Sequence, residues 1–208
     1  RPAHEAGQPE RPMITWVRLV ALCGVLLLAG PSAWSQDVER WDRYLDRPRG
    51  PYRGQVVDAE TKAPLAGAVV VALWWRDRVY PFHSAAEHYA VRETLTDAGG
   101  LFWLDAKDVE EGAPRRTYHP EFFIFLPAYG SYPRKHVSPR GFTGSIFEGL
   151  GPVVELPRLE GREERRKHLL LFGHGDFSDR PFKEVPELVR RINAERIAVG
   201  LEPHLPSE

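Results

Sequence analysis

The sequence predicts an all-β domain, a sandwich of about seven strands, that continues into a helical extension at its C-terminal end. Short apolar segments rich in β-branched and aromatic residues recur between residues 52 and 158, and turns rich in glycine and proline separate them. Residues 159–208 differ, because apolar residues there recur with a helical period among charged ones. Hydrophobic residues make up 42% of the chain, which is enough to build a core.

The first strands are the clearest. Tyr52–Asp58 alternates weakly between apolar and polar residues, and residues 68–75 form a continuous β-branched and aromatic run of strand length. Residues 89–96 alternate as a half-exposed strand does. The glycine-rich turn at residues 97–100 then predicts a hairpin, in which Leu101–Leu104 is the returning strand.

The remaining segments complete the sandwich and begin the tail. Residues 121–127 and 152–156 predict two more strands. Residues 77–88 form a long insertion, in which the segment between His83 and His88 is expected to be a loop. The charged and then apolar residues 159–172 predict a helix that ends near Gly173.

The second tail helix is predicted more sharply, over residues 186–199. One face of it carries four apolar side chains, Val185, Leu188, Val189 and Ile192. Gly200 follows in the position where helices often end, and Leu201 can make the accompanying apolar contact. We expect this helix to pack on the sandwich or on a partner, because the stripe would be costly to leave in water.

The N-terminal segment is typical of an exported protein. Residues 1–12 look like a leader of non-native or mis-assigned sequence, and residues 13–35 have the order of a signal peptide: a basic residue, an apolar run at residues 19–30, a breaker and small residues. Cleavage after Ser35 would leave Gln36 at the mature N-terminus. The predicted location is periplasmic or secreted.

Two alternatives concern the same segment. An uncleaved anchor is one, although the apolar run is shorter than the roughly 20 residues that span a bilayer. Lipid attachment at Cys23 is the other, and it is disfavoured because Cys23 lies inside the run. Residues 36–51 predict a linker that follows a short amphipathic helix with Val38, Trp41 and Leu45.

Charge excludes one class of partner. The formal net charge is −1, so the chain has no long-range field that would attract nucleic acid or an anionic membrane. The charge run at residues 162–167 contains both signs and predicts a solvated helix face.

Three motifs resemble one known family. The chain shows G-x-V-x-D at residues 54–58, P-L-x-G-A-x-V at residues 64–70 and T-D-x-x-G-x-F at residues 96–102. In that order they are similar to the carboxypeptidase regulatory-like domain. The resemblance implies a transthyretin-like Greek-key sandwich without catalytic residues, which has binding or structural roles in exported proteins. Asp97 is expected to cap the amides of its turn.

Two enzyme families share this kind of sandwich. The hydroxyisourate hydrolases rely on a Tyr-Arg-Gly-Ser tetrad, which this sequence lacks. The intradiol ring-cleaving dioxygenases hold iron through two tyrosines and an H-x-H histidine pair. Tyr80 and Tyr118 stand in plausible places for them, but no two histidines have that spacing.

The histidines give no complete metal site. His83 and His88 are five residues apart and share neither a strand face nor a helix face. His174 lies between glycines, where a turn residue is favoured over a metal ligand. No catalytic residue, cofactor or metal ligand is therefore assigned.

Aromatic residues raise a binding hypothesis. Trp74 and Trp75 point to opposite faces of their strand, so one is expected in the core and the other on the outer face, covered by the insertion or the terminal helix. An exposed aromatic residue on a face of the sandwich could stack on a sugar ring or fill a partner's pocket. The candidates are Trp74, Trp75, Trp103, Phe122, Phe123 and Phe125. The sequence thus predicts an exported, non-catalytic binding or structural module, with an unknown protein or carbohydrate partner. A dioxygenase-like metal enzyme and an accessory subunit of an envelope assembly are the alternatives.

Overall fold

The computed structural model describes residues 50–135, 151–170 and 183–203. All of them belong to one of two units into which the chain divides, Arg43–Glu208. The expectations for the leader, the signal peptide, Cys23 and the linker with its short helix lie outside the described residues, as do those for His174 and the end of the first tail helix.

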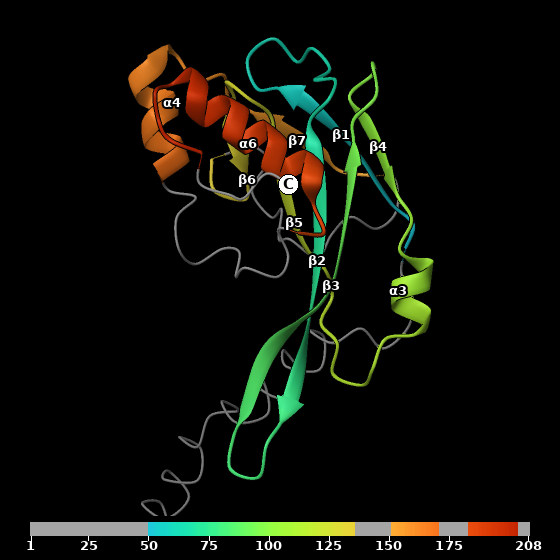
Figure 1. Ribbon diagram of the computed structural model, residues 1–208. Coiled ribbons are helices and arrows are strands. Elements are labelled where there is room, and N and C mark those ends of the chain that lie inside the picture. Colours follow the sequence, from blue (N-terminus) through green and yellow to red (C-terminus); the bar gives the residue numbers. More distant parts are fainter. Residues whose placement is uncertain (1–49, 136–150, 171–182, 204–208) are drawn as a thin grey trace, which may run out of the picture. The chain divides into compact units, whose positions relative to one another are not determined.

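Two sheets, in which most neighbouring strands are antiparallel, form a β-sandwich (Figure 1). The first has the order β4-β1-β7 and contains β1 (Tyr52–Asp58), β4 (Leu101–Leu104) and β7 (Val153–Leu156). The second has the order β3-β2-β5-β6 and contains β2 (Val69–Val79), β3 (Ser84–Leu95), β5 (Glu121–Phe125) and β6 (Ser131–Tyr132). The predicted all-β class is confirmed at this level.

The main core lies between the two sheets. Alternate residues of each strand point into it, as the pleat requires. The three-stranded sheet contributes Val56, Phe102 and Leu156, and the other sheet contributes Trp74 and Ile124, all buried in one cluster. Trp74 is therefore the core member of the tryptophan pair.

The turn at residues 97–100 joins the two sheets, so the predicted hairpin is wrong. β4 pairs with β1, with Gly54 opposite Phe102, and not with β3. The Asp97 carboxylate does accept hydrogen bonds from the amides of Gly99 and Leu101. Gly100 has φ +71°, and a Cβ there would lie 2.4 Å from the Val56 carbonyl oxygen. The turn passes so close to β1 that only glycine fits.

The expected loop between His83 and His88 is also wrong, because that segment is part of β3. β2 and β3 run on through the insertion as a paired ribbon, with Arg76 opposite Glu87 and Val79 opposite Ser84. A register irregularity between Trp74 and Trp75 marks where the ribbon leaves the sandwich. We call the part from Trp75 to His88 the arm.

Within the described residues, three helices accompany the sheets: α3 (Lys107–Glu111), α4 (Gly161–Leu170) and α6 (Pro186–Ala198). Neither α3 nor β6 was expected from the sequence. None of the helices in the described ranges has the length and apolar character needed to cross a bilayer.

The C-terminal helix α6 ends as predicted. Gly200 has φ +78°. The Gly200 amide donates to the Ile197 carbonyl at 3.0 Å, and the Leu201 amide donates to the Arg196 carbonyl at 2.8 Å. This is a Schellman arrangement, which satisfies the last carbonyls of the helix. Leu201 packs against the neighbouring apolar cluster.

Helix α6 covers the outer face of the four-stranded sheet (Figure 1). A second apolar cluster joins Leu188 and Ile192 of the helix to Val69, Val71 and Phe125 of the strands. Trp75 packs at the edge of this cluster, so the second tryptophan lies on the outer face. The expectation that the helix docks on the sandwich is confirmed.

Polar contacts fix both ends of α6. The Glu93 carboxylate on β3 accepts hydrogen bonds from the amides of Glu187 and Leu188, at 2.9 and 3.1 Å. These are amides that the first turn of a helix leaves without partners. At the other end, Arg162 on α4 donates to the Val199 carbonyl at 3.0 Å. The expectation of a solvated face holds for Arg162, Arg166 and Lys167, which are exposed. It is wrong for Arg165, whose side chain is 27% exposed and pairs with buried Glu195.

Candidate functional site

The arm lies outside the core. Trp75 at its base packs against the second apolar cluster, and residues 76–88 belong to neither cluster. The segment Arg116–Tyr118 lies beside its base, because the Asp77 amide donates to the Arg116 carbonyl and the Tyr118 amide to the Trp75 carbonyl. From Arg78 onwards the arm consists of β2 and β3 alone. A two-stranded ribbon is only marginally stable in water without further packing.

Side chains along the arm hold the ribbon in shape. Arg76 donates to Glu87 at 2.7 Å and lies over the ring of Tyr89, 5.7 Å from its centroid. The hydrogen bond from Arg76 lowers the pKa of Glu87, so the pair is charged at neutral pH. Arg78 lies over the ring of Tyr80. The arm is thus built with its own cross-strand contacts.

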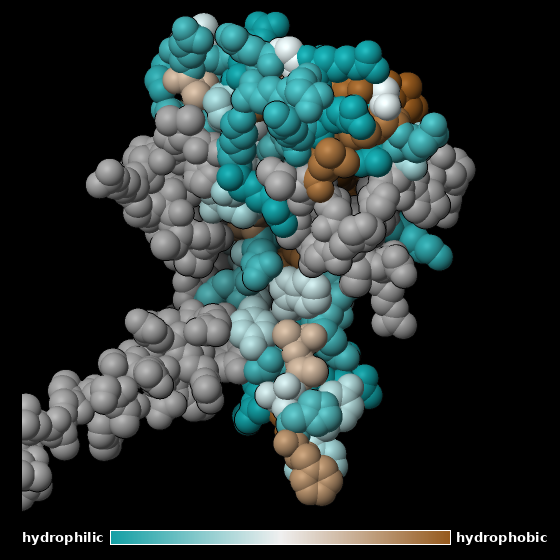
Figure 2. Space-filling view, turned by 90° about the vertical axis from the view of Figure 1, so that its left-hand side faces the viewer, coloured by the Kyte–Doolittle hydropathy of each residue, from teal (hydrophilic) through white to brown (hydrophobic). Residues whose placement is uncertain are grey.

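The tip of the arm is apolar and exposed. The Tyr80 amide donates to the His83 carbonyl at 2.8 Å, which closes a tight turn around Pro81 and Phe82. The Tyr80 and His83 rings stack with their centroids 4.8 Å apart. Phe82 is 99% exposed, Val79 62% and Tyr80 39%. Figure 2 shows the arm standing away from the body, with an end coloured on the hydrophobic side of the scale.

The outer face of the three-stranded sheet holds a second exposed apolar group. Leu101 is 51% exposed, Trp103 56% and Val153 42%. Strand pairing places them together, because Gln55 lies opposite both Leu101 and Val153, and Arg53 lies opposite Trp103. We call these five residues the Trp103 face. Trp103 is the exposed aromatic residue that the binding hypothesis requires.

The residues weighed as iron ligands lie in different surroundings. Tyr118 donates to the Asp77 carboxylate at 2.6 Å near the base of the arm. Tyr80 stacks on His83 at the tip. His88 packs edge-on against Trp75, with the ring centroids 6.0 Å apart. Each of these side chains has a structural contact in place.

No group of three or more histidine, cysteine or acidic side chains within residues 50–135, 151–170 and 183–203 could hold a metal ion. His136, His174 and His204 lie outside those ranges.

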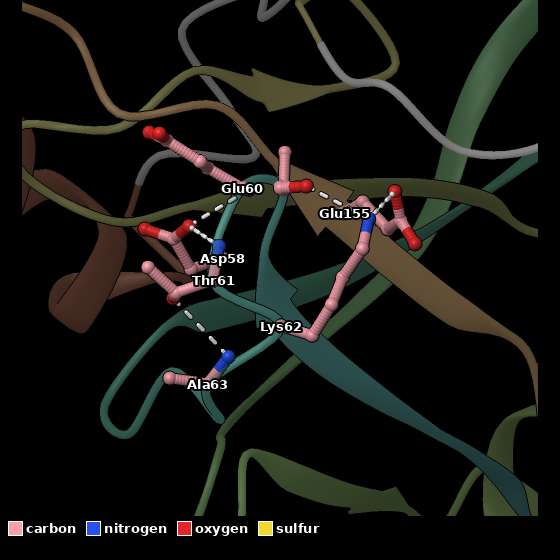
Figure 3. A network of polar contacts seen from close by, with 7 residues as sticks. Asp58, Glu60, Thr61, Lys62, Ala63 and Glu155 are labelled. Atoms are coloured by element: carbon pink, nitrogen blue, oxygen red, sulfur yellow. Dashed lines mark hydrogen bonds and ion pairs between the residues drawn. The ribbon is translucent and has the colours of Figure 1, made fainter.

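The aspartate that ends the first motif organises a turn (Figure 3). One Asp58 carboxylate oxygen accepts hydrogen bonds from the amides of Glu60 and Thr61, at 2.9 and 2.8 Å. The bond from the Thr61 amide is the main reason why the pKa of Asp58 is lowered. Lys62 follows with φ 60° and bridges to Glu155 on β7 at 2.7 Å. The motif residue is thus used in building the sandwich.

A buried carboxylate closes one end of the core, and the sequence did not signal it. Glu110 on α3 is 4% exposed. It accepts hydrogen bonds from the Tyr52 hydroxyl, from the Trp74 indole nitrogen at 3.3 Å and from the Gly50 amide at 2.8 Å. Tyr52 and Trp74 are core aromatic residues whose polar atoms need a partner when buried. Glu110 supplies it.

His168 on α4 has a strongly lowered pKa, and it too lies in a packed position. It is 4% exposed, and burial lowers its pKa to about 4. The positive charges of Lys135 and Arg134 act in the same direction, while Glu164 and Glu195 act against it. His168 is therefore neutral at physiological pH.

We expect the free energy of unfolding to depend on pH, and we expect His168→Gln to weaken this dependence. Folded His168 stays neutral down to about pH 4, whereas the unfolded side chain takes up its proton near 6.5. Between these values the unfolded state binds more protons than the folded state. The free energy of unfolding therefore decreases as the pH is lowered, by up to about 3 kcal/mol. Urea titrations from pH 7.5 to 4 should show a steeper loss in the wild type. Parallel profiles would contradict the assignment.

Comparisons with known proteins place the chain in no family. No family model matches it, and none of the curated proteins matches it. Among solved structures, it is similar to a 9R-lipoxygenase from Cyanothece PCC8801, with 11% sequence identity and a TM-score of 0.27. That alignment covers 88% of this chain and 30% of the lipoxygenase chain. Similarity at this level carries no inference about function.

Proposed function

We propose that this protein is an exported, non-catalytic module that binds a partner through the arm, on a Greek-key sandwich of the carboxypeptidase regulatory-like, transthyretin-like class. The observation that carries the proposal is the exposure of Phe82, which is 99% exposed at the end of a ribbon that projects from the sandwich. Burying such a side chain against a partner contributes roughly 1.5–3 kcal/mol.

The contrast between the arm and the rest of the chain supports binding rather than catalysis. The buried acids Glu110 and Glu195 are hydrogen-bonded within the fold, and Asp58 and Asp97 organise turns. Phe82 at the arm tip, which is 99% exposed, has no comparable structural use. Surface of this kind is typical of a site that another molecule covers.

Two further points support the class and the location. Asp58 and Asp97 end or follow strands as the family motifs imply, and each one accepts two amide hydrogen bonds in its turn. The order of basic residue, apolar run and small residues in the segment 13–35 supports export. The partner is then a protein or a carbohydrate of the periplasm or the extracellular space.

Photo-crosslinking from the arm tip tests this function. We replace Phe82 by benzoyl-phenylalanine in the producing cells, with Ile197, which is 60% exposed on α6, as the matched control position. Position 82 should give a defined protein adduct and position 197 should not. Mass spectrometry of the same protein should find Gln36 at its N-terminus. An arm that yields no adduct beyond that of position 197 would refute binding through the tip.

A further inference from the structure

We infer that the arm's partner is a second copy of this chain, and that each arm tip packs on the Trp103 face of the other copy. The inference rests on the proposed function, because it names the partner that the arm binds. It follows from where the exposed apolar side chains gather, from how far the arm reaches and from the area that the contact would bury.

The large exposed apolar side chains of the described residues gather in two places. Three lie at the arm tip (Val79, Tyr80 and Phe82), and three lie on the Trp103 face (Leu101, Trp103 and Val153). The other three, Leu95, Leu170 and Ile197, lie on separate elements, β3, α4 and α6. The protein thus has one protruding apolar surface and one open apolar sheet face.

One chain cannot bring its own two surfaces together. Trp74 is the last residue of β2 in the main core, and Val79 lies about 16 Å further along the strand at the ordinary rise per residue. The tip therefore projects away from the sandwich, whereas Trp103 lies on β4 in the body of the other sheet (Figure 1). Contact between the two surfaces needs a second molecule.

Reciprocal exchange gives a closed assembly of sufficient size. Two copies related by a two-fold axis form the arm-to-face contact twice and leave neither surface open. The exposed parts of these side chains amount to roughly 700 Å² in each chain, so the pair buries about 1,400 Å² in total, which is the size of a standard stable interface. Phe82 against the Trp103 indole also provides an aromatic pair of the kind that anchors interfaces.

Molar mass in solution tests the inference first. Light scattering on the full chain, with Cys23→Ser to remove the one thiol, should give twice the monomer mass at tens of micromolar. Phe82→Ser and Trp103→Ser should each shift the mass to that of a monomer, while Ile197→Ser should keep the dimer. All three side chains are more than half exposed, so each of the three variants should still fold. Its thermal melt should stay close to that of the parent protein in its monomeric form. A monomeric parent, or a dimer that survives Phe82→Ser, would overturn the inference.

Mixed crosslinking then tests the arrangement. Ser84→Cys places a thiol beside the tip, and Arg53→Cys places one beside Trp103, so both apolar anchors remain. A short bis-maleimide should join the two variants when they are mixed, and should join neither to Arg190→Cys on exposed α6 surface. Self-linking of Ser84→Cys without linking to Arg53→Cys would show tip-to-tip contact and overturn the arm-to-face contact.

The two proposals fail in different ways. A monomeric protein whose position 82 crosslinks to another protein in cells refutes self-association and leaves binding through the arm intact. A monomeric protein whose position 82 gives no adduct refutes both.

Discussion

Replacing Arg165 by alanine is expected to destabilise the protein by about 3–5 kcal/mol, the largest effect of any single exchange considered for this chain. Arg165 on α4 donates to both carboxylate oxygens of Glu195 on α6, each at 2.6 Å. Glu195 is 4% exposed and also accepts a hydrogen bond from the Ala128 amide at 3.1 Å. Removal of Arg165 leaves a buried carboxylate without its counter-charge.

The pair also decides how the tail is attached. The hydrogen bonds to Glu195 raise the pKa of Arg165, so the guanidinium keeps its charge. It joins α4, α6 and the turn at Ala128, which has φ 67°. Breaking it should therefore loosen both tail helices together.

Urea denaturation measures this effect, and Arg190→Ala is the matched control. Arg190 also forms a 2.6 Å ion pair, with Glu187, but its side chain is 67% exposed, so its removal should cost about 0.2–1 kcal/mol. The double variant Arg165→Met/Glu195→Leu should recover most of the lost stability, because it removes both charges. Equal losses for Arg165→Ala and Arg190→Ala would show that burial does not matter here.

Replacing Ile192 by alanine is expected to destabilise the monomer by about 2–5 kcal/mol. Ile192 is 4% exposed, in the cluster that α6 shares with the outer face of the four-stranded sheet. The exchange leaves a cavity in that cluster, because the surrounding strands can close it only in part.

Ile197→Ala on the same helix is the control for this second effect. Ile197 is 60% exposed, so its truncation should change the free energy of unfolding by less than about 0.5 kcal/mol. Thermal and urea unfolding of the two variants measure the difference. If Ile192→Ala unfolds like Ile197→Ala, the helix does not contribute to the stability of the sandwich.

The strands could be predicted because their side chains alternate or branch as buried strands require. The run at residues 68–75 corresponds to the centre of β2, and the stripe through Leu188 and Ile192 corresponds to the buried face of α6. These signals are local. They depend on the period of the apolar residues and need no knowledge of what packs on what.

Which strands pair with each other could not be predicted in the same way. The turn at Asp97–Gly100 has the chemistry of a hairpin, but the same chemistry allows the chain to cross from one sheet to the other. The choice depends on packing between residues far apart in the sequence, such as Gly54 against Phe102. The parallel pairing of β1 with β7 is long-range as well.

The arm was missed for a related reason. Its strands are exposed on both faces, so they lack the apolar alternation that marks a strand, and Ala85 and Ala86 favour no particular structure. The charge run was misread because Arg165 has the composition of a surface residue, while its partner Glu195 lies 30 positions away. The Trp103 face was not predicted, because the sequence left Trp103 among six aromatic candidates, and its neighbours depend on the sheet order.

Metal analysis of the purified protein tests the central claim most directly, which is that this module acts by contact and not by metal chemistry. The measurement covers the whole chain, including the histidines outside the described ranges. Plasma mass spectrometry after dialysis, without chelators, should find iron and zinc each well below one equivalent per chain. One equivalent of either metal, retained through dialysis, would contradict the account and restore the metal-dependent enzyme.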